Sequence, residues 1–192
     1  KLDLAKNRMY CNYAFYFGAT ADNEKELADL KNLEGCCGIK LFAGSSTGNL
    51  LVADEKDIDT VFQNSSKVVA VHSEDEEILN NNKKLIKNND VHSHPTWRSV
   101  ECAMSSTRRI VRIAEKYNKK AHVLHITTKE EIDFLSQHKG NITFEITPQH
   151  LTIYAPECYD KLGTYAQMNP PIRDKSHYDR LWYAVKNNLN DT

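Results

Sequence analysis

The chain has 192 residues, 40% of them hydrophobic, which is enough for one substantial core and predicts a single domain over residues 1–192. Its 25 basic and 26 acidic residues give a net charge of −1, which argues against a nucleic-acid partner. No apolar run approaches the roughly 20 residues of a membrane span, and five cysteines without C-x-x-C spacing predict reduced thiols in a cytoplasmic protein.

Strand-like and helical patterns alternate along the chain, which predicts a parallel sheet. Strands are expected over residues 10–17, 39–42, 68–72, 121–125 and 141–147. Two helices are expected between them from helical spacing of apolar residues, at Leu27, Leu30 and Leu33 and at Ile58, Val61 and Phe62. A long amphipathic helix is expected over 99–119 and a final helix over 178–188. Thr128 and Glu131 form a capping pair that predicts a further helix start.

Two architectures accommodate five parallel strands. An open doubly wound sheet would need a phosphate-binding turn, but neither G-x-G-x-x-G nor a Walker sequence occurs. The alternation therefore favours a (β/α)8 barrel, of which five strands are visible in 192 residues, whereas a whole barrel takes about 250.

Three of the predicted strands end on a residue that can hold a metal: Lys40, His72 and His125. The carboxyl ends of barrel strands carry the active site, and imidazole is a common neutral ligand of transition metals. Spacing alone fits equally well a structural role, in which His72 and His125 are core histidines with their hydrogen bonds satisfied.

Lys40 lies within the apolar run Ile39–Phe42, where a buried ammonium group is costly. It could extend to solvent or pair with an acid such as Glu74, although the acidic run 74–77 also fits a solvated helix start. Carbamylation by carbon dioxide would instead convert Lys40 into an anionic ligand able to bridge two divalent cations.

Five segments in order resemble the dihydroorotases of the amidohydrolase superfamily, a resemblance that covers nearly the whole chain. They are Gly38-Ile39-Lys40-Leu41-Phe42-Ala43-Gly44-Ser45-Ser46-Thr47-Gly48, Val71-His72-Ser73-Glu74-Asp75, 122–130 with His125, Glu145-Ile146-Thr147-Pro148-Gln149-His150-Leu151 and Asn169-Pro170-Pro171-Ile172-Arg173.

The resemblance implies a metal-dependent barrel of which about strands 3 to 7 are present. It also implies reversible conversion between L-dihydroorotate and N-carbamoyl-L-aspartate in pyrimidine biosynthesis, through a hydroxide that bridges two zinc ions. By this match Lys40 is the carboxylated bridging ligand, His72 and His125 bind the second metal, and Asn169 contacts the substrate ring. Without the resemblance, Asn169 is better explained as a turn residue before two prolines. A full-length form is expected to be a homodimer.

Other family residues have no match in this chain: the His-x-His pair of the first strand, the arginine after it, an asparagine of the second strand and the acid–base aspartate. No catalytic residue is therefore assigned. His92-Ser93-His94 lacks a preceding apolar run and is interpreted as local structure or a loop contact, and Gln149 replaces a more usual histidine. The alternatives are a hydantoinase or allantoinase, a non-catalytic scaffold subunit, and an inactive fragment.

Overall fold

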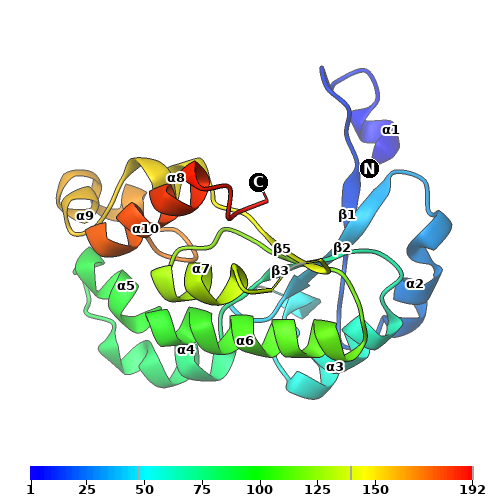
Figure 1. Cartoon of the computed structure of the whole chain (residues 1–192), viewed down its shortest axis with the longest axis horizontal. Coiled ribbons are helices and arrows are strands. Elements are labelled where there is room, and N and C mark those ends of the chain that lie inside the picture. The colour runs from blue at the N-terminus through cyan, green and yellow to red at the C-terminus, as the bar shows by residue number, and fades with distance from the viewer. Residues whose placement is uncertain (47, 139, 192) are drawn as a thin grey trace.

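The computed structural model describes residues 1–46, 48–138 and 140–191, and a parallel sheet lies at its centre (Figure 1). The strands are β1 (Phe15–Gly18), β2 (Cys36–Phe42), β3 (Val69–His72), β4 (Ala121–Val123) and β5 (Ile142–Phe144). They pair in chain order, each strand parallel to the next. An open doubly wound sheet reverses its strand order at a switch point, and this sheet does not. The order is that of successive βα units in a barrel.

The helices are α1 (Leu2–Ala5), α2 (Glu24–Asp29), α3 (Glu55–Asn64), α4 (Glu76–Asn82), α5 (His94–Trp97), α6 (Val100–Lys116), α7 (Lys129–Leu135), α8 (Pro148–Thr152), α9 (Glu157–Leu162) and α10 (Lys175–Lys186), with 3-10 turns η1 (Leu30–Asn32), η2 (Gly48–Leu50), η3 (Lys83–Leu85), η4 (Val91–Ser93) and η5 (Gly163–Ala166). In Figure 1, helices α3, α4 and α6 lie below the strands, and α8, α9 and α10 lie at the upper left. Helix α2 packs on α3, α3 on α6, α6 on α7, and α7 on α10. This succession makes one continuous outer layer.

The two faces of the sheet differ in chemistry because successive side chains of a strand point to opposite faces. Ile39, Leu41 and Val71 are fully buried in the main core beneath the helices. Their neighbours Lys40 and His72 lie on the other face, where polar groups gather. The fold therefore directs the chemically versatile side chains away from the helical layer.

Several predicted boundaries are wrong in detail. The first strand begins at Phe15, and Tyr10 is fully exposed, so its aromatic character reflects no sheet contact. The fourth strand stops at Val123, which leaves His125 in the loop that follows. The short helices α5, α8 and α9 were not expected, since four to six residues are too few for an amphipathic pattern.

The acidic run 74–77 is not the solvated helix start that its charge predicts. Glu74 is completely buried and Asp75 is 7% exposed, while α4 begins only at Glu76. Asp75 caps that helix by accepting hydrogen bonds from the backbone N–H groups of Glu77 and Ile78. The acidic run therefore predicts the helix start correctly. It is wrong for Glu74, which was expected in solvent and is buried among partners inside the protein.

All five cysteines are free thiols, as their spacing predicts, and Cys102 and Cys158 are buried. Among the described helices, none combines the length and apolar character that crossing a bilayer requires.

Candidate metal centre

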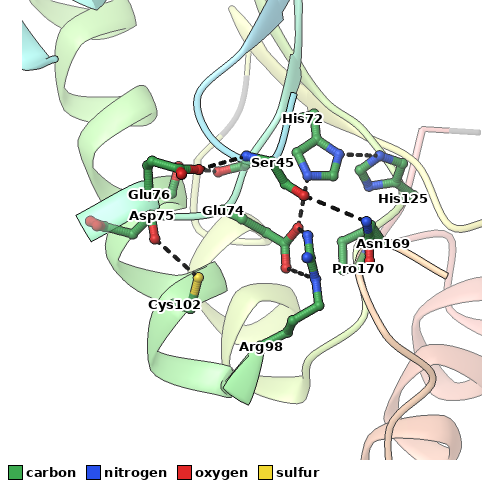
Figure 2. A network of polar contacts seen from close by, with 12 residues as sticks. Ser45, His72, Glu74, Asp75, Glu76, Arg98, Cys102, His125, Asn169 and Pro170 are labelled. Atoms are coloured by element: carbon green, nitrogen blue, oxygen red, sulfur yellow. Dashed lines mark hydrogen bonds and ion pairs between the residues drawn. The ribbon is translucent and has the colours of Figure 1, made fainter. Parts of the chain in front are cut away.

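His72 and His125 come together where β3 and β4 end (Figure 2). His72 closes β3, and His125 follows β4 by two residues in a left-handed backbone conformation with φ of 41°. His72 Nδ1 lies 3.2 Å from His125 Nε2. A histidine with positive φ is uncommon and tends to occur where function requires a particular side-chain position. The topology thus directs one ring nitrogen of each residue to a common point.

The hydrogen-bond partners indicate which nitrogens are available there. His72 Nε2 lies 2.8 Å from Glu74 Oε2 and donates to that carboxylate, so its Nδ1 presents a lone pair. Burial first, and then His72, His150 and Lys40, lower the pKa of His125 to about 3, so His125 is neutral near pH 7. Its Nδ1 is buried and makes no hydrogen bond to any described residue.

The two facing nitrogens have the separation that one metal ion needs. Nitrogen ligands each about 2.0–2.1 Å from a tetrahedral zinc ion lie roughly 3.3 Å apart, close to the 3.2 Å between His72 Nδ1 and His125 Nε2. A carboxylate on the other nitrogen of His72 is also the usual support of a metal-binding histidine. Within 1–46, 48–138 and 140–191, no three His, Cys, Asp or Glu residues form a complete ligand set. The donor set therefore fits one divalent ion and needs further ligands.

Lys40 lies on the same face of the sheet as His72. Its Nζ donates to the carbonyl oxygen of Leu41 over 2.9 Å and sits 3.6 Å from the centre of the Phe42 ring. Burial lowers the pKa of Lys40 to about 7, although Glu145 opposes the shift. A pairing with Glu74 is wrong, because that carboxylate is taken by His72 and Arg98. A neutral amine is the form that reacts with carbon dioxide.

Asn169 approaches the same region from the loop before α10 (Figure 2). Its exposed side chain donates from Nδ2 toward Ser45 Oγ at 3.5 Å. Ser45 belongs to the loop after β2, and its backbone N–H donates to Glu76 Oε2. Gly44 beside it must lack a side chain, because a Cβ there would lie 2.3 Å from the backbone oxygen of Glu74. Thr47 of this loop lies outside the described residues.

Glu74 and Arg98 belong to the site and were missed from the sequence. Both are almost fully buried and form an ion pair behind His72. For Glu74 a signal existed, since a residue two positions after a strand-end histidine continues on the same face. For Arg98, 24 positions away, no local signal existed.

A second polar pair faces the same side of the sheet. His122 Nε2 lies 3.3 Å from Glu145 Oε2, and Glu145 Oε1 accepts a hydrogen bond from the backbone N–H of His125. Glu145 thus ties β5 to the loop that carries the second histidine of the candidate centre.

His92 and His94 do not approach the candidate centre through any recorded contact. His94 Nε2 donates to the carbonyl oxygen of Met168, and His92 pairs with exposed Asp160. The contact of His94 with Met168 is a loop contact, one of the two roles predicted for this segment.

Lowering the pH should destabilise the metal-free protein through His150. Burial lowers the pKa of His150 to about 4, whereas an unfolded histidine titrates near 6.5. Between these values the unfolded state binds more protons, so stability falls as the pH falls. A difference of this size is worth on the order of 3 kcal/mol. Urea unfolding at several pH values should show this loss, and His150→Gln should reduce it.

The surface variant His92→Gln is the control, because the side chain of His92 is 43% exposed. An equal acid sensitivity in wild type and His150→Gln would show that His150 does not contribute.

No family model matches the chain. It is similar to a dihydroorotase of Methanosarcina mazei, at 29% identity over an alignment that covers 100% of this chain and 43% of the relative. It is also similar to an L-hydantoinase of Paenarthrobacter aurescens, at 24% identity over 98% of this chain and 43% of the relative. The chain thus spans about two fifths of the length of the curated relatives it matches.

Solved structures show the same fold. An L-hydantoinase (dihydropyrimidinase) from Arthrobacter aurescens superposes with a TM-score of 0.87 at 23% identity, over 94% of this chain and 42% of that chain. A D-hydantoinase gives a TM-score of 0.81 at 22% identity. The five-stranded sheet and its helices therefore have the fold of part of a TIM-type barrel, and in sequence the chain is similar to dihydroorotases and hydantoinases.

Proposed function

We propose that this chain provides half of a binuclear metal site in a cyclic amidohydrolase. The single observation that carries the proposal is the approach of His72 Nδ1 to His125 Nε2 at 3.2 Å, with His72 supported from behind by Glu74. These two nitrogens would bind one divalent ion, zinc being the expected metal.

Lys40 would supply the bridge to a second ion. Its neutral amine would attack carbon dioxide, forming an N–C bond and releasing one proton, which leaves an anionic carbamate. The position of Lys40 on the face that carries His72, away from the helices, supports this role. Once bound, the metal ions would act as Lewis acids toward a carbonyl oxygen and lower the pKa of water.

Asn169 would hold the substrate by its side-chain amide, which both donates and accepts hydrogen bonds and so matches a cyclic amide group. Its exposed position next to Ser45 supports this role. Arg173, four residues later, anchors this segment through buried hydrogen bonds, which would keep Asn169 in place.

We further propose L-dihydroorotate and N-carbamoyl-L-aspartate as the substrate pair. Support comes from the Asn169-Pro170-Pro171-Ile172-Arg173 segment and from similarity to dihydroorotases of several organisms. A hydantoinase is the second candidate, because an L-hydantoinase is among both the sequence relatives and the structural neighbours. Both reactions break a ring C–N bond with water.

The assay compares these substrates on the full protein that contains this chain. Zinc-loaded protein should form dihydroorotate from N-carbamoyl-L-aspartate and leave hydantoins unchanged, and His125→Gln should abolish the reaction. Preferred hydrolysis of a hydantoin would favour the second candidate. Tight zinc binding without turnover of either substrate would favour the non-catalytic scaffold.

A further inference from the structure

A buried ion pair lies directly behind His72 (Figure 2). Arg98 Nε donates to Glu74 Oε1 over 3.0 Å, and Arg98 Nη2 donates to Glu74 Oε2. The Glu74 side chain is 0% exposed and that of Arg98 is 3% exposed. His72 Nε2 reaches the same Oε2 atom at 2.8 Å. One carboxylate therefore binds both the arginine and the candidate metal ligand.

This arrangement decides which nitrogen of His72 carries the proton. An ionised carboxylate only accepts hydrogen bonds, so the nitrogen that faces it must be the N–H. The proton is then on Nε2, and Nδ1, which faces His125, keeps its lone pair. With the opposite tautomer, an N–H group would occupy the position where the metal has to bind.

We infer that Glu74 and Arg98 are positioning residues that hold His72 in its metal-binding tautomer. The inference deepens the proposed metal site and rests on that proposed function for its role in the enzyme. Neither residue faces the point between the two histidines, so neither is a ligand. Glu74 acts through His72, and Arg98 acts through Glu74.

The backbone that carries Arg98 is held by the candidate substrate segment. Arg173 Nη1 donates to the carbonyl oxygen of Arg98 over 2.5 Å and to that of Pro95 over 3.4 Å. Arg173 Nη2 donates to the carbonyl oxygen of Ser99. A chain of contacts thereby runs from Arg173 through Arg98 and Glu74 to His72.

Glu74→Gln removes the carboxylate that selects the tautomer of His72, while it keeps the size of the side chain. In one orientation the amide oxygen faces His72 Nε2, and in the other the NH₂ group faces it. Either orientation leaves one Arg98 donor against the NH₂ group, so neither is clearly favoured. Because the two orientations select opposite tautomers of His72, the variant should populate both.

Glu131→Gln is the matched control. Glu131 is also a buried glutamate, and it accepts hydrogen bonds from the hydroxyl groups of Thr107 and Thr128, with no histidine contact recorded. Its replacement changes a buried glutamate in the same way and leaves the contacts of His72 intact.

The test reads the tautomer directly, without metal, by ¹H–¹⁵N NMR of the ring nitrogens of the whole chain at about pH 8, above the pKa of about 6.5 of a model histidine. Wild type and Glu131→Gln should show His72 protonated on Nε2 alone, with assignment from the loss of signals in His72→Gln. Glu74→Gln should show both tautomers. The inference is overturned if wild-type His72 carries its proton on Nδ1, or if folded Glu74→Gln keeps the Nε2–H form alone.

Zinc affinity, measured by competition with a chelator, completes the test. Glu74→Gln should bind zinc about 10- to 100-fold more weakly, as expected for loss of a ligand's supporting group, while Glu131→Gln should match wild type. Arg98→Lys, which loses the two-pronged contact but keeps the charge, should preserve the tautomer and weaken zinc binding. Unchanged affinity in Arg98→Lys would remove Arg98 from the inference. Wild type that shows the expected tautomer but binds no zinc would defeat the proposed function and leave the positioning role standing.

Discussion

Replacing Lys40 by methionine should lower the metal content of the protein and at the same time stabilise its metal-free form. The pKa of Lys40 is lowered to about 7 by burial, against 10.5 for an ordinary lysine. The unfolded state therefore binds the extra proton between these values, so the stability of wild type should rise as the pH increases from 7 to 10. Methionine has a similar length and no charge to desolvate.

The expected gain for Lys40→Met at pH 7 is roughly 2 kcal/mol, after allowance for the partial exposure of Lys40. Urea unfolding at several pH values measures it, and the rise toward pH 10 should be smaller in the variant. Elemental analysis of metal-loaded protein should show the lost metal. The exposed Lys120→Met is the matched control for removal of a lysine charge. If Lys40→Met keeps the full metal content and still cyclises N-carbamoyl-L-aspartate, Lys40 is not the bridge.

Replacing Arg173 by methionine should produce the largest loss of stability, about 3–5 kcal/mol for several unsatisfied buried acceptors at about 1–3 kcal/mol each. The Arg173 guanidinium is buried, donates to the carbonyl oxygens of Arg98 and Ser99, and also donates to the Thr127 hydroxyl. Methionine fills a similar space but leaves these acceptors without donors, and an unsatisfied buried acceptor is costly.

Equilibrium unfolding of Arg173→Met against Arg180→Met isolates this effect. Arg180 also contacts an aspartate, Asp133, but the two side chains are 30% and 57% exposed. Its loss should cost less than about 1 kcal/mol, as for other surface ion pairs. Similar losses in the two variants would show that the buried contacts of Arg173 are not what stabilises the loops.

Much of the fold could be predicted because strands and helices have local causes. The alternation of apolar runs and helical spacing predicted the parallel sheet, and Thr128 caps α7 as its spacing from Glu131 indicates. Segments with few tertiary contacts were predicted less well. Residues 10–14 have strand-like composition but find no neighbouring strand, because composition alone cannot supply a pairing partner.

The candidate site likewise contains residues that the sequence indicated and residues that it did not. Lys40, His72 and His125 were found in the sequence because each follows or ends an apolar run, and the edge of a parallel sheet collects such residues. Arg98 and Arg173 could not be found, since their roles depend on contacts with residues 24 to 75 positions away. The strength of their interactions depends on burial, which local sequence does not encode.

The sequence by itself determined the order of the elements and the candidate metal-binding residues, because both follow from local periodicity and side-chain chemistry. Only the tertiary structure decided that Glu74 is buried and bound to Arg98 instead of Lys40, and that His72 and His125 face each other. Those features arise where segments distant in the chain meet in a water-poor interior, and there the environment decides which groups are charged and which nitrogen holds a proton.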